Sequence, residues 1–183
     1  MQITGMLWGR KLLDLVEFPH SEVRGPELGV DDIKDMIKRH GQVFIKPLFK
    51  GGVGKKGKSG LLGRVDNITD ALKEKERLYF CEHVDGFSKV KSDGVTYEGA
   101  VPADYEVYFS ISESTEHRCP IMTVTHHGGV DIEELDEDKI KVVPFDALTG
   151  LKAFHVSNAL MELGAPPEVI SPLVQNLPKL WDL

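Results

Sequence analysis

The sequence predicts an α+β fold with mixed and antiparallel sheets, and three observations carry this prediction. First, helical and strand-like segments alternate along 183 residues of ordinary globular composition, with 41% hydrophobic and 28% charged residues. Second, the glycine- and lysine-rich stretch 51–60 lies between two strand-like runs. Third, the run 105–112 alternates polar and apolar residues and can pair with 119–126 through a polar turn, as antiparallel strands do.

The N-terminal part of the chain predicts two helices followed by a strand. Residues 6–17 carry a rough helical stripe of apolar side chains. A second helix is expected at 31–40, where Ile33 and Met36 would form part of the buried face. The β-branched and aromatic residues of 42–49 then favour a strand. This strand would lead directly into the glycine- and lysine-rich stretch.

The remaining segments continue the alternation. After the stretch, 61–65 predicts the returning strand, 69–77 a short polar helix and 77–84 a third strand. Glycines among polar residues in 85–103 predict a hairpin or a long loop. Beyond the antiparallel pair, the expected elements are a strand at 140–145 and helices at 152–163 and 167–181.

Charge and composition exclude several classes of function. The net charge of −7 argues against nucleic acid as the main partner, because duplex binding rests on a basic surface. The apolar runs are too short to span a membrane and the N-terminus lacks a secretory pattern, so we expect a soluble cytoplasmic protein. Cys81 and Cys119 lack the spacing of a disulfide framework or a zinc site. Basic residues crowd 46–64, which suits an anionic small molecule.

The glycine- and lysine-rich stretch can be interpreted in two ways. Residues 52–59 match the phosphate-loop pattern GxxxxGK[ST], in which backbone N–H groups and a lysine hold phosphates. A true phosphate loop runs straight into a helix, and Gly60 and Gly63 disfavour a helix starting at Lys58. A hairpin that folds over phosphates is therefore preferred. The alternative is a phosphate-loop NTPase or kinase that uses Lys58 and Ser59, and a solvated lysine-rich turn would be a purely structural explanation.

Three groups of short motifs follow one another in a distinctive order. They are Phe44-Ile45-Lys46-Pro47 followed by Gly57-Lys58-Ser59-Gly60-Leu61, then Gly128-Gly129-Val130-Asp131-Ile132-Glu133-Glu134, and then Phe145-Asp146-Ala147-Leu148-Thr149-Gly150-Leu151. This order resembles the ATP-grasp domain of the succinyl-CoA synthetase beta subunit and ATP-citrate lyase family, from the N-terminal helix to about Gly164. The resemblance implies an ATP-grasp fold with two lobes, of which the second is incomplete. Residues 20–84 would form a small lid subdomain with the glycine-rich hairpin, and 1–19 with 85–183 would belong to the larger lobe.

The resemblance also implies which residues contact the phosphates of ATP. Lys46 would lie over the α- and β-phosphates, and Lys56, Gly57 and Lys58 would close over them from the hairpin. Cations on a loop can offset the charge of a polyanion, so these residue types suit the role.

The same resemblance implies contacts with adenine and ribose. Glu82, at the end of the expected third strand, would occupy the adenine side, with the backbone of His83 and Val84 beside it. Glu106 resembles the acidic residue near the ribose and phosphates. ATP would then bind between the two lobes. A strand end offers backbone donors and acceptors to adenine, and a carboxylate can accept ribose hydroxyls.

The chemistry implied by the resemblance is that of an ADP-forming acid–CoA ligase of the ATP-citrate lyase or succinyl-CoA synthetase type. ATP would phosphorylate a histidine, the phosphate would activate a carboxylic acid, and CoA would capture the acyl phosphate. The family's histidine belongs to another domain or subunit, and its Mg²⁺ ligands belong to a later segment with a Glu-x-Asn-Pro motif. We therefore assign no catalytic residue and no metal ligand in this chain.

The expected cofactors are ATP and Mg²⁺, with the Mg²⁺ ligands outside this chain. The expected partners are a complementary C-terminal segment and a CoA-binding or phosphohistidine subunit or domain, in an oligomeric enzyme. The chain alone is expected to be inactive. A non-catalytic nucleotide-binding module is a further alternative.

The sequence departs from the family pattern at two places. Residues 85–103 are longer than the family's connection between the adenine side and the second glutamate. His126 and His127 precede the glycine pair where an acidic or small residue is typical. We expect these histidines to pack near a turn and do not assign them as phosphoryl carriers.

Overall fold

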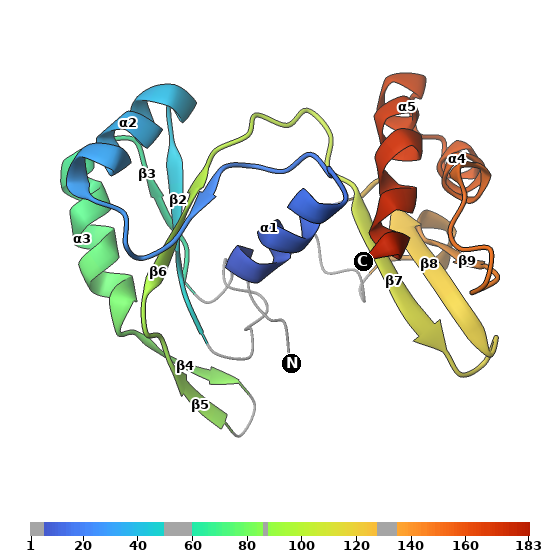
Figure 1. The fold of residues 1–183 in the computed structure, drawn as a ribbon, viewed down its shortest axis with the longest axis horizontal. Helices are drawn as coiled ribbons and strands as arrows, with labels where there is room; N and C mark the ends of the chain where they lie inside the picture. Colours follow the sequence, from blue (N-terminus) through green and yellow to red (C-terminus); the bar gives the residue numbers. More distant parts are fainter. Residues whose placement is uncertain (1–5, 50–59, 86–87, 128–134) are drawn as a thin grey trace. The chain divides into compact units, whose positions relative to one another are not determined.

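The computed structural model describes residues 6–49, 60–85, 88–127 and 135–183 (Figure 1). The chain divides into two compact units. The first unit comprises 1–15 and 19–102, and the second comprises 16–18 and 103–183. Each unit has its own hydrophobic core.

The first unit is built on a four-stranded antiparallel sheet with the order β1-β6-β2-β3. Its described strands are β1 (Val23–Arg24), β2 (Val43–Pro47), β3 (Gly63–Val65), β4 (Glu82–Asp85), β5 (Ser88–Lys91) and β6 (Val95–Gly99). Its described helices are α1 (Met6–Leu15), α2 (Val30–His40) and α3 (Ile68–Tyr79). β4 and β5 form a separate two-stranded hairpin.

β2 and β3 confirm the hairpin that the sequence predicts around the glycine- and lysine-rich stretch. The two strands are antiparallel, with Val43 opposite Val65 and Ile45 opposite Gly63. The next helix, α3, begins only at Ile68, so a strand and not a helix follows the stretch. This order contradicts the phosphate-loop alternative, which needs a helix at that point. Lys58 and Ser59 themselves lie outside the described residues.

One face of the four-stranded sheet is covered by α2 and α3 (Figure 1). Burial alternates along β2: Val43 and Ile45 are buried in this core, while Phe44 and Lys46 are only partly buried. Since successive side chains of a strand point to opposite faces, Phe44 and Lys46 lie on the face away from α2 and α3. Burying an aliphatic side chain contributes about 1.5–3 kcal/mol, so the core face fixes which residues the other face presents.

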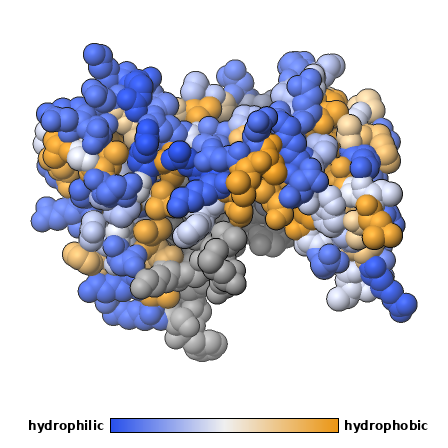
Figure 2. Space-filling model, in the orientation of Figure 1, coloured by the Kyte–Doolittle hydropathy of each residue, from blue (hydrophilic) through white to orange (hydrophobic). Residues whose placement is uncertain are grey.

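The outer surface of α2 is polar, and it appears as the hydrophilic region at the upper left of Figure 2. Ile33 and Met36 face the core, as the sequence predicts, and the other face carries exposed charges. Acidic residues occupy the first turn and basic residues the last, an arrangement that the helix dipole favours.

Two predictions about the first unit are only partly right. The strand expected at 77–84 is in part helix, because α3 continues to Tyr79 with Leu78 fully buried in the core. Residues 85–103, expected as a hairpin or long loop, contain β5, which forms a hairpin with β4, and also β6, a strand that was not predicted and that pairs with β2 over its whole length. This pairing puts β6 in the same sheet as β2, and the division into a small lid at 20–84 and a larger lobe stays a prediction.

The second unit is an antiparallel three-stranded sheet with two helices. Its described elements are β7 (Tyr108–Ser114), β8 (Cys119–Thr125), β9 (Lys141–Pro144), α4 (Ala153–Glu162), α5 (Pro167–Asn176) and two short 3₁₀ helices, Glu137–Lys139 and Leu177–Asp182. β8 pairs with both β7 and β9, so the predicted antiparallel pair is confirmed. Its core is formed by residues such as Met122, Val124, Val156 and Leu160.

The turn before α4 depends on one glycine. Gly150 has a φ of +73°, and a Cβ there would lie 2.5 Å from Cδ1 of Trp181. Asp146 organises the same turn by accepting backbone N–H bonds from Leu148 at 2.9 Å and Thr149 at 2.8 Å. Both the backbone conformation and the close approach of the indole therefore require glycine at this position.

Candidate functional site

Lys46 lies on the sheet face away from α2 and α3, close to where β2 enters the glycine- and lysine-rich stretch. Its Nζ forms an ion pair with Oε2 of Glu98 on β6. The side chains are 24% and 19% exposed, so the pair is partly shielded from water. A half-buried lysine beside a carboxylate is restricted in position.

Glu98 is held from two directions because β6 lies between β1 and β2. Val23 of β1 and Phe44 of β2 are its two cross-strand neighbours. One carboxylate oxygen, Oε1, accepts a hydrogen bond of 2.8 Å from the hydroxyl of Ser21, and the other faces Lys46. The sequence prediction missed Glu98. The alternation of Thr96 and Glu98 with buried core residues is the signal that could have indicated a strand there.

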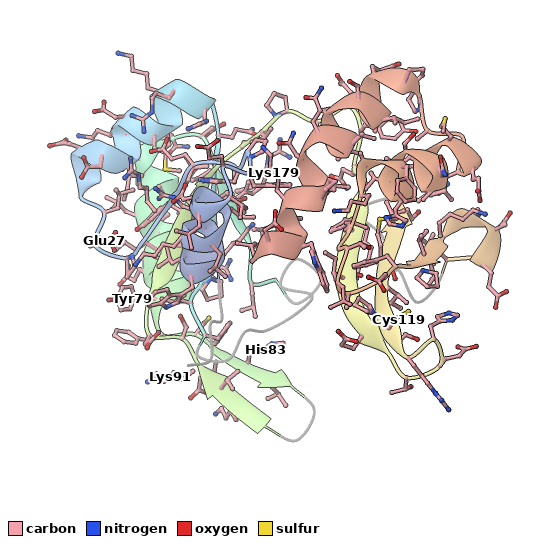
Figure 3. The ribbon with its side chains drawn as sticks, turned by 45° about the vertical axis from the view of Figure 1, so that its right-hand side comes forward. Glu27, Tyr79, His83, Lys91, Cys119 and Lys179 are labelled. Atoms are coloured by element: carbon pink, nitrogen blue, oxygen red, sulfur yellow. The ribbon has the colours of Figure 1, made fainter. Side chains whose placement is uncertain are left out.

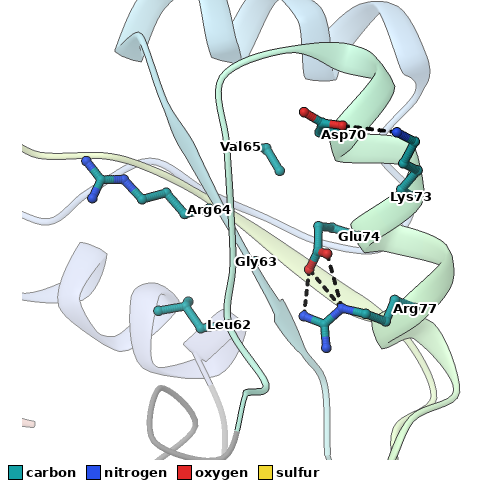
Figure 4. Close-up of a pocket in the computed structure, with 8 residues that line it drawn as sticks. All are labelled: Leu62, Gly63, Arg64, Val65, Asp70, Lys73, Glu74 and Arg77. Atoms are coloured by element: carbon teal, nitrogen blue, oxygen red, sulfur yellow. Dashed lines mark hydrogen bonds and ion pairs between the residues drawn. The ribbon is translucent and has the colours of Figure 1, made fainter.

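Phe44 and Arg64 extend the same face. The Lys46 Nζ and the Arg64 guanidinium carbon each lie 6.0 Å from the centroid of the Phe44 ring, at the outer limit of a cation–π contact. Arg64 donates two hydrogen bonds, of 2.8 and 2.6 Å, to Oε1 of Gln42. In Figure 4, Arg64 points away from α3, which lies on the other side of β3. Two cations and one carboxylate therefore share this face with an aromatic ring.

A second group of charges lines a cavity of about 300 Å³ between β3 and α3 (Figure 4). The Arg77 guanidinium binds Glu74, with a shortest contact of 2.6 Å, and donates to the Gly60 carbonyl at 2.9 Å. Lys73 pairs with Asp70 at 3.3 Å. These charged side chains bind one another and join α3 to the segment before β3. We therefore assign no ligand to this cavity.

Glu22, next to β1, joins this part of the sheet to α2. Its carboxylate accepts hydrogen bonds from Arg24 at 3.0 Å, from Arg39 at 2.9 and 3.0 Å and from His40 at 2.8 Å. The His40 contact, followed by those of Arg39 and Arg24, lowers the pKa of Glu22 to about 2. Glu22 therefore stays ionised. It fixes the C-terminal end of α2 against the start of β1, the strand that pairs with β6.

The residues predicted for adenine lie on the separate β4–β5 hairpin. Figure 3 labels His83 there, together with Lys91 on the neighbouring strand. Glu82 begins β4 and does not end a strand, and it pairs with Lys89 at 2.6 Å, which lowers the pKa of Glu82. The His83 ring lies 6.2 Å from that of Phe49, and Val84 is exposed. The four-stranded sheet that carries Lys46 does not include them.

The other predicted residues fall in different parts of the chain. Glu106 belongs to the second unit, where it is exposed just before β7. Lys56, Gly57 and Lys58 lie outside the described residues, as does the motif 128–134.

His126 and His127 pack against each other at the end of β8. Their ring centroids are 4.3 Å apart, and Tyr105 lies 6.0 Å from His126. Burial, and to a lesser extent His127, lowers the pKa of His126, so its imidazole is neutral at physiological pH. This geometry is consistent with the expected packing near a turn.

Metal-ligating side chains do not cluster in the part of the chain that the structure describes. No three or more histidine, cysteine, aspartate or glutamate residues come together there in a way that could hold a metal ion. No helix of the described residues is long and apolar enough to cross a membrane.

Comparison with known proteins connects this geometry to a family. Residues 18–183 match the ATP-grasp domain family. The chain is 27% identical over 164 residues to the beta subunit of the ADP-forming succinate–CoA ligase of Desulfatibacillum aliphaticivorans, covering 86% of this chain and 42% of that subunit. It is 31% identical over 147 residues to the corresponding Geobacter sulfurreducens subunit, covering 77% of this chain and 38% of the subunit.

Solved structures share the fold. The ATP citrate lyase of Methanothrix soehngenii, determined with citrate and coenzyme A, superposes with a TM-score of 0.66 at 19% identity, covering 96% of this chain and 41% of that one. PH1788 from Pyrococcus horikoshii superposes with a TM-score of 0.72 at 16% identity, covering 98% and 76%. The chain thus spans well under half the length of the ligase subunits that it resembles. The predicted fold and resemblance are confirmed, and the chain belongs to the ATP-grasp domain family.

Proposed function

We propose that this chain supplies the ATP-binding part of an ADP-forming acid–CoA ligase, and that Lys46 binds the phosphates. The observation that carries the proposal is the partly buried Lys46–Glu98 pair, on the face of β2 and β6 that lies away from α2 and α3. Membership of the ATP-grasp family and the similarity to ligase beta subunits support it.

The position of Lys46 suits phosphate binding. A lysine ammonium acts as a point charge with three N–H donors. One N–H can stay hydrogen-bonded to Glu98 while another donates to a phosphate oxygen. Partial burial strengthens this attraction, because a charge in a less polar surrounding is screened less than one in water. Arg64 adds positive charge on the same face.

The remaining contacts of the nucleotide are proposed from the resemblance. Lys56, Gly57 and Lys58, which lie between β2 and β3 in the sequence, would close over the phosphates. Glu82 with the backbone of His83 and Val84 would contact adenine, and Glu106 would contact the ribose. The observed partner of Glu82, Lys89, would have to release it or share it for that role.

The overall reaction would follow from binding and orientation. ATP would transfer its γ-phosphate to a histidine of a partner subunit or domain, which would activate a carboxylic acid for capture by CoA. This chain's part would be to hold the triphosphate and neutralise its charge. Mg²⁺ would supply further charge neutralisation, and no described residue is assigned to it. The intact enzyme would be cytoplasmic and oligomeric.

Titration calorimetry with ATP tests the phosphate role. Losing a charge-assisted contact typically costs about 1.5–3 kcal/mol, so Lys46→Ala should weaken ATP binding by roughly 10–100-fold. Lys38→Ala is the matched control, because Lys38 is exposed on α2. An unchanged Kd in Lys46→Ala would overturn the proposal.

A further inference from the structure

Ser21 lies beside the candidate site although it belongs to neither strand of the Lys46–Glu98 pair. It precedes β1 by two residues, and β1 places Val23 opposite Glu98. Residues two apart in an extended segment point to the same face, so the Ser21 side chain faces Glu98 diagonally. The 2.8 Å hydrogen bond from the Ser21 hydroxyl to Glu98 Oε1 is partly buried.

This hydrogen bond has a consequence for Lys46. With one carboxylate oxygen held by Ser21, Glu98 presents its other oxygen to the ammonium group. Immobilising a free lysine side chain costs conformational entropy. A lysine that is already held by Glu98 loses less when a ligand binds, which is the general benefit of preorganisation.

His20 in turn fixes the backbone of Ser21. Its Nδ1 lies 2.8 Å from the Ser21 carbonyl oxygen, and its Nε2 lies 2.8 Å from Oδ1 of Asp14 on α1. A carbonyl and an ionised carboxylate only accept hydrogen bonds, so both contacts are made together only when both ring nitrogens carry a proton. The hydrogen bond to the Ser21 carbonyl, followed by that to Asp14, raises the pKa of His20.

Arg10 is the other charged group on α1 that faces this segment. Its Nη1 donates to the Val23 carbonyl at 2.6 Å, and its Nε lies 3.8 Å from Asp14. The Arg10 charge opposes protonation of His20, but it is outweighed by the two acceptors. α1 therefore holds the backbone on both sides of Glu22 and keeps Ser21 at a fixed distance from Glu98.

We propose that Ser21 is a positioning residue for Lys46, acting through Glu98, and that His20 holds Ser21 in the required place. The inference rests on the proposed role of Lys46 in binding ATP. The segment between α1 and β1 would then affect nucleotide affinity although it does not contact the nucleotide.

The first experiment compares Ser21→Ala with Ser21→Thr by ATP titration. The alanine variant should bind ATP about 3–10-fold more weakly, as expected for the loss of one hydrogen bond. The threonine variant keeps the hydroxyl and suits an extended backbone, so its Kd should return to within about twofold of the parent. Ser112→Ala, on an exposed position of β7, is the matched control. Equal ATP affinity in Ser21→Ala and the parent chain would overturn the inference.

A second measurement does not depend on ATP. Trace acetylation with mass spectrometry reports how readily each lysine amine reacts, with Lys38 as the internal reference. In Ser21→Ala, Lys46 should react several-fold faster than in the parent, and in Ser21→Thr it should not. A purely structural role of Ser21 would lower stability without this selective change, and unchanged Lys46 reactivity would overturn the positioning role. If the parent chain fails to bind ATP while Lys46 reactivity responds, the proposed function fails and the positioning role stands.

The role of His20 is tested by pH. The imidazolium contacts are complete below the pKa of His20 and are lost as the pH rises through that raised pKa. ATP affinity of the parent should therefore fall as the pH rises above 6.5, the ordinary pKa of histidine, and through the raised pKa of His20, and His20→Gln should reduce this dependence. The same pH profile in both proteins would overturn the role of His20.

Discussion

Two ion pairs of the first unit join a lysine and a glutamate across antiparallel strands, yet they differ in every other respect. Lys46 and Glu98 are separated by 52 residues and are at most 24% exposed, and Glu98 has a further partner, Ser21. Glu82 and Lys89 lie on one hairpin and are 49% and 63% exposed. The first pair depends on the complete sheet, whereas the second needs only a local turn. The comparison indicates that Lys46–Glu98, and not Glu82–Lys89, can hold its side chains in one position for a ligand.

The largest expected difference between the pairs is in stability. Glu98→Ala leaves a partly buried ammonium without its carboxylate and a serine hydroxyl without its acceptor, and should lower the free energy of unfolding by about 2–3 kcal/mol. Glu82→Ala removes an exposed pair and should leave the free energy of unfolding almost unchanged. Urea unfolding followed by circular dichroism measures both. Equal losses in the two variants would show that the pairs are equivalent.

Acid should act on a third carboxylate, Glu22, more strongly than on Glu82. Its lowered pKa means that the contribution of Glu22 to stability is present above the ordinary value of 4.5 and is lost as the pH falls toward 2. We expect the loss of about 1–2 kcal/mol after allowance for solvent screening. Urea unfolding at pH 7 and pH 3 should show a smaller pH effect in Glu22→Gln than in the parent. The same effect in both would contradict the assignment to Glu22.

The smallest effect is expected on the opposite face of β6. Tyr97 is fully buried opposite Ile45, and its hydroxyl has no hydrogen-bond partner among the described residues. Burial raises the pKa of Tyr97 to about 12. Tyr97→Phe removes this unsatisfied hydroxyl and should leave stability unchanged or raise it by up to about 1 kcal/mol. A clear loss of stability on thermal unfolding would indicate that the hydroxyl is bonded.

The same contrast explains what the sequence could predict. Helices α2 and α4, the β2–β3 hairpin and the β7–β8 pair follow from local periodicity, and each is confirmed. The strand expected from 77 is wrong because burial of Leu78 in the core outweighs the local preference for strand. The glycines near β6 led to the prediction of a hairpin or long loop where a central strand lies. That strand is defined by pairing with β2, which no local pattern records.

In the candidate site, too, a local motif could be predicted and a long-range contact could not. Lys46 was identified because it stands in a short motif beside the glycine-rich stretch. Glu98 and Ser21 were missed because their only relation to Lys46 is spatial, through strands distant in the sequence. The roles of Lys46, Glu82 and Glu106 in binding the nucleotide all remain predictions.

The central position of β6 also links the site to the way the chain folds. A shift of one residue in its pairing with β2 would turn Glu98 toward the core and Tyr97 toward the other face. Such a slipped sheet would bury a carboxylate and expose a large aromatic ring, so it is strongly disfavoured. The alternation of Tyr97 and Glu98 therefore disfavours a misregistered sheet. Because the ion pair joins residues 52 apart, forming it also costs more chain entropy than forming a local pair such as Glu82–Lys89.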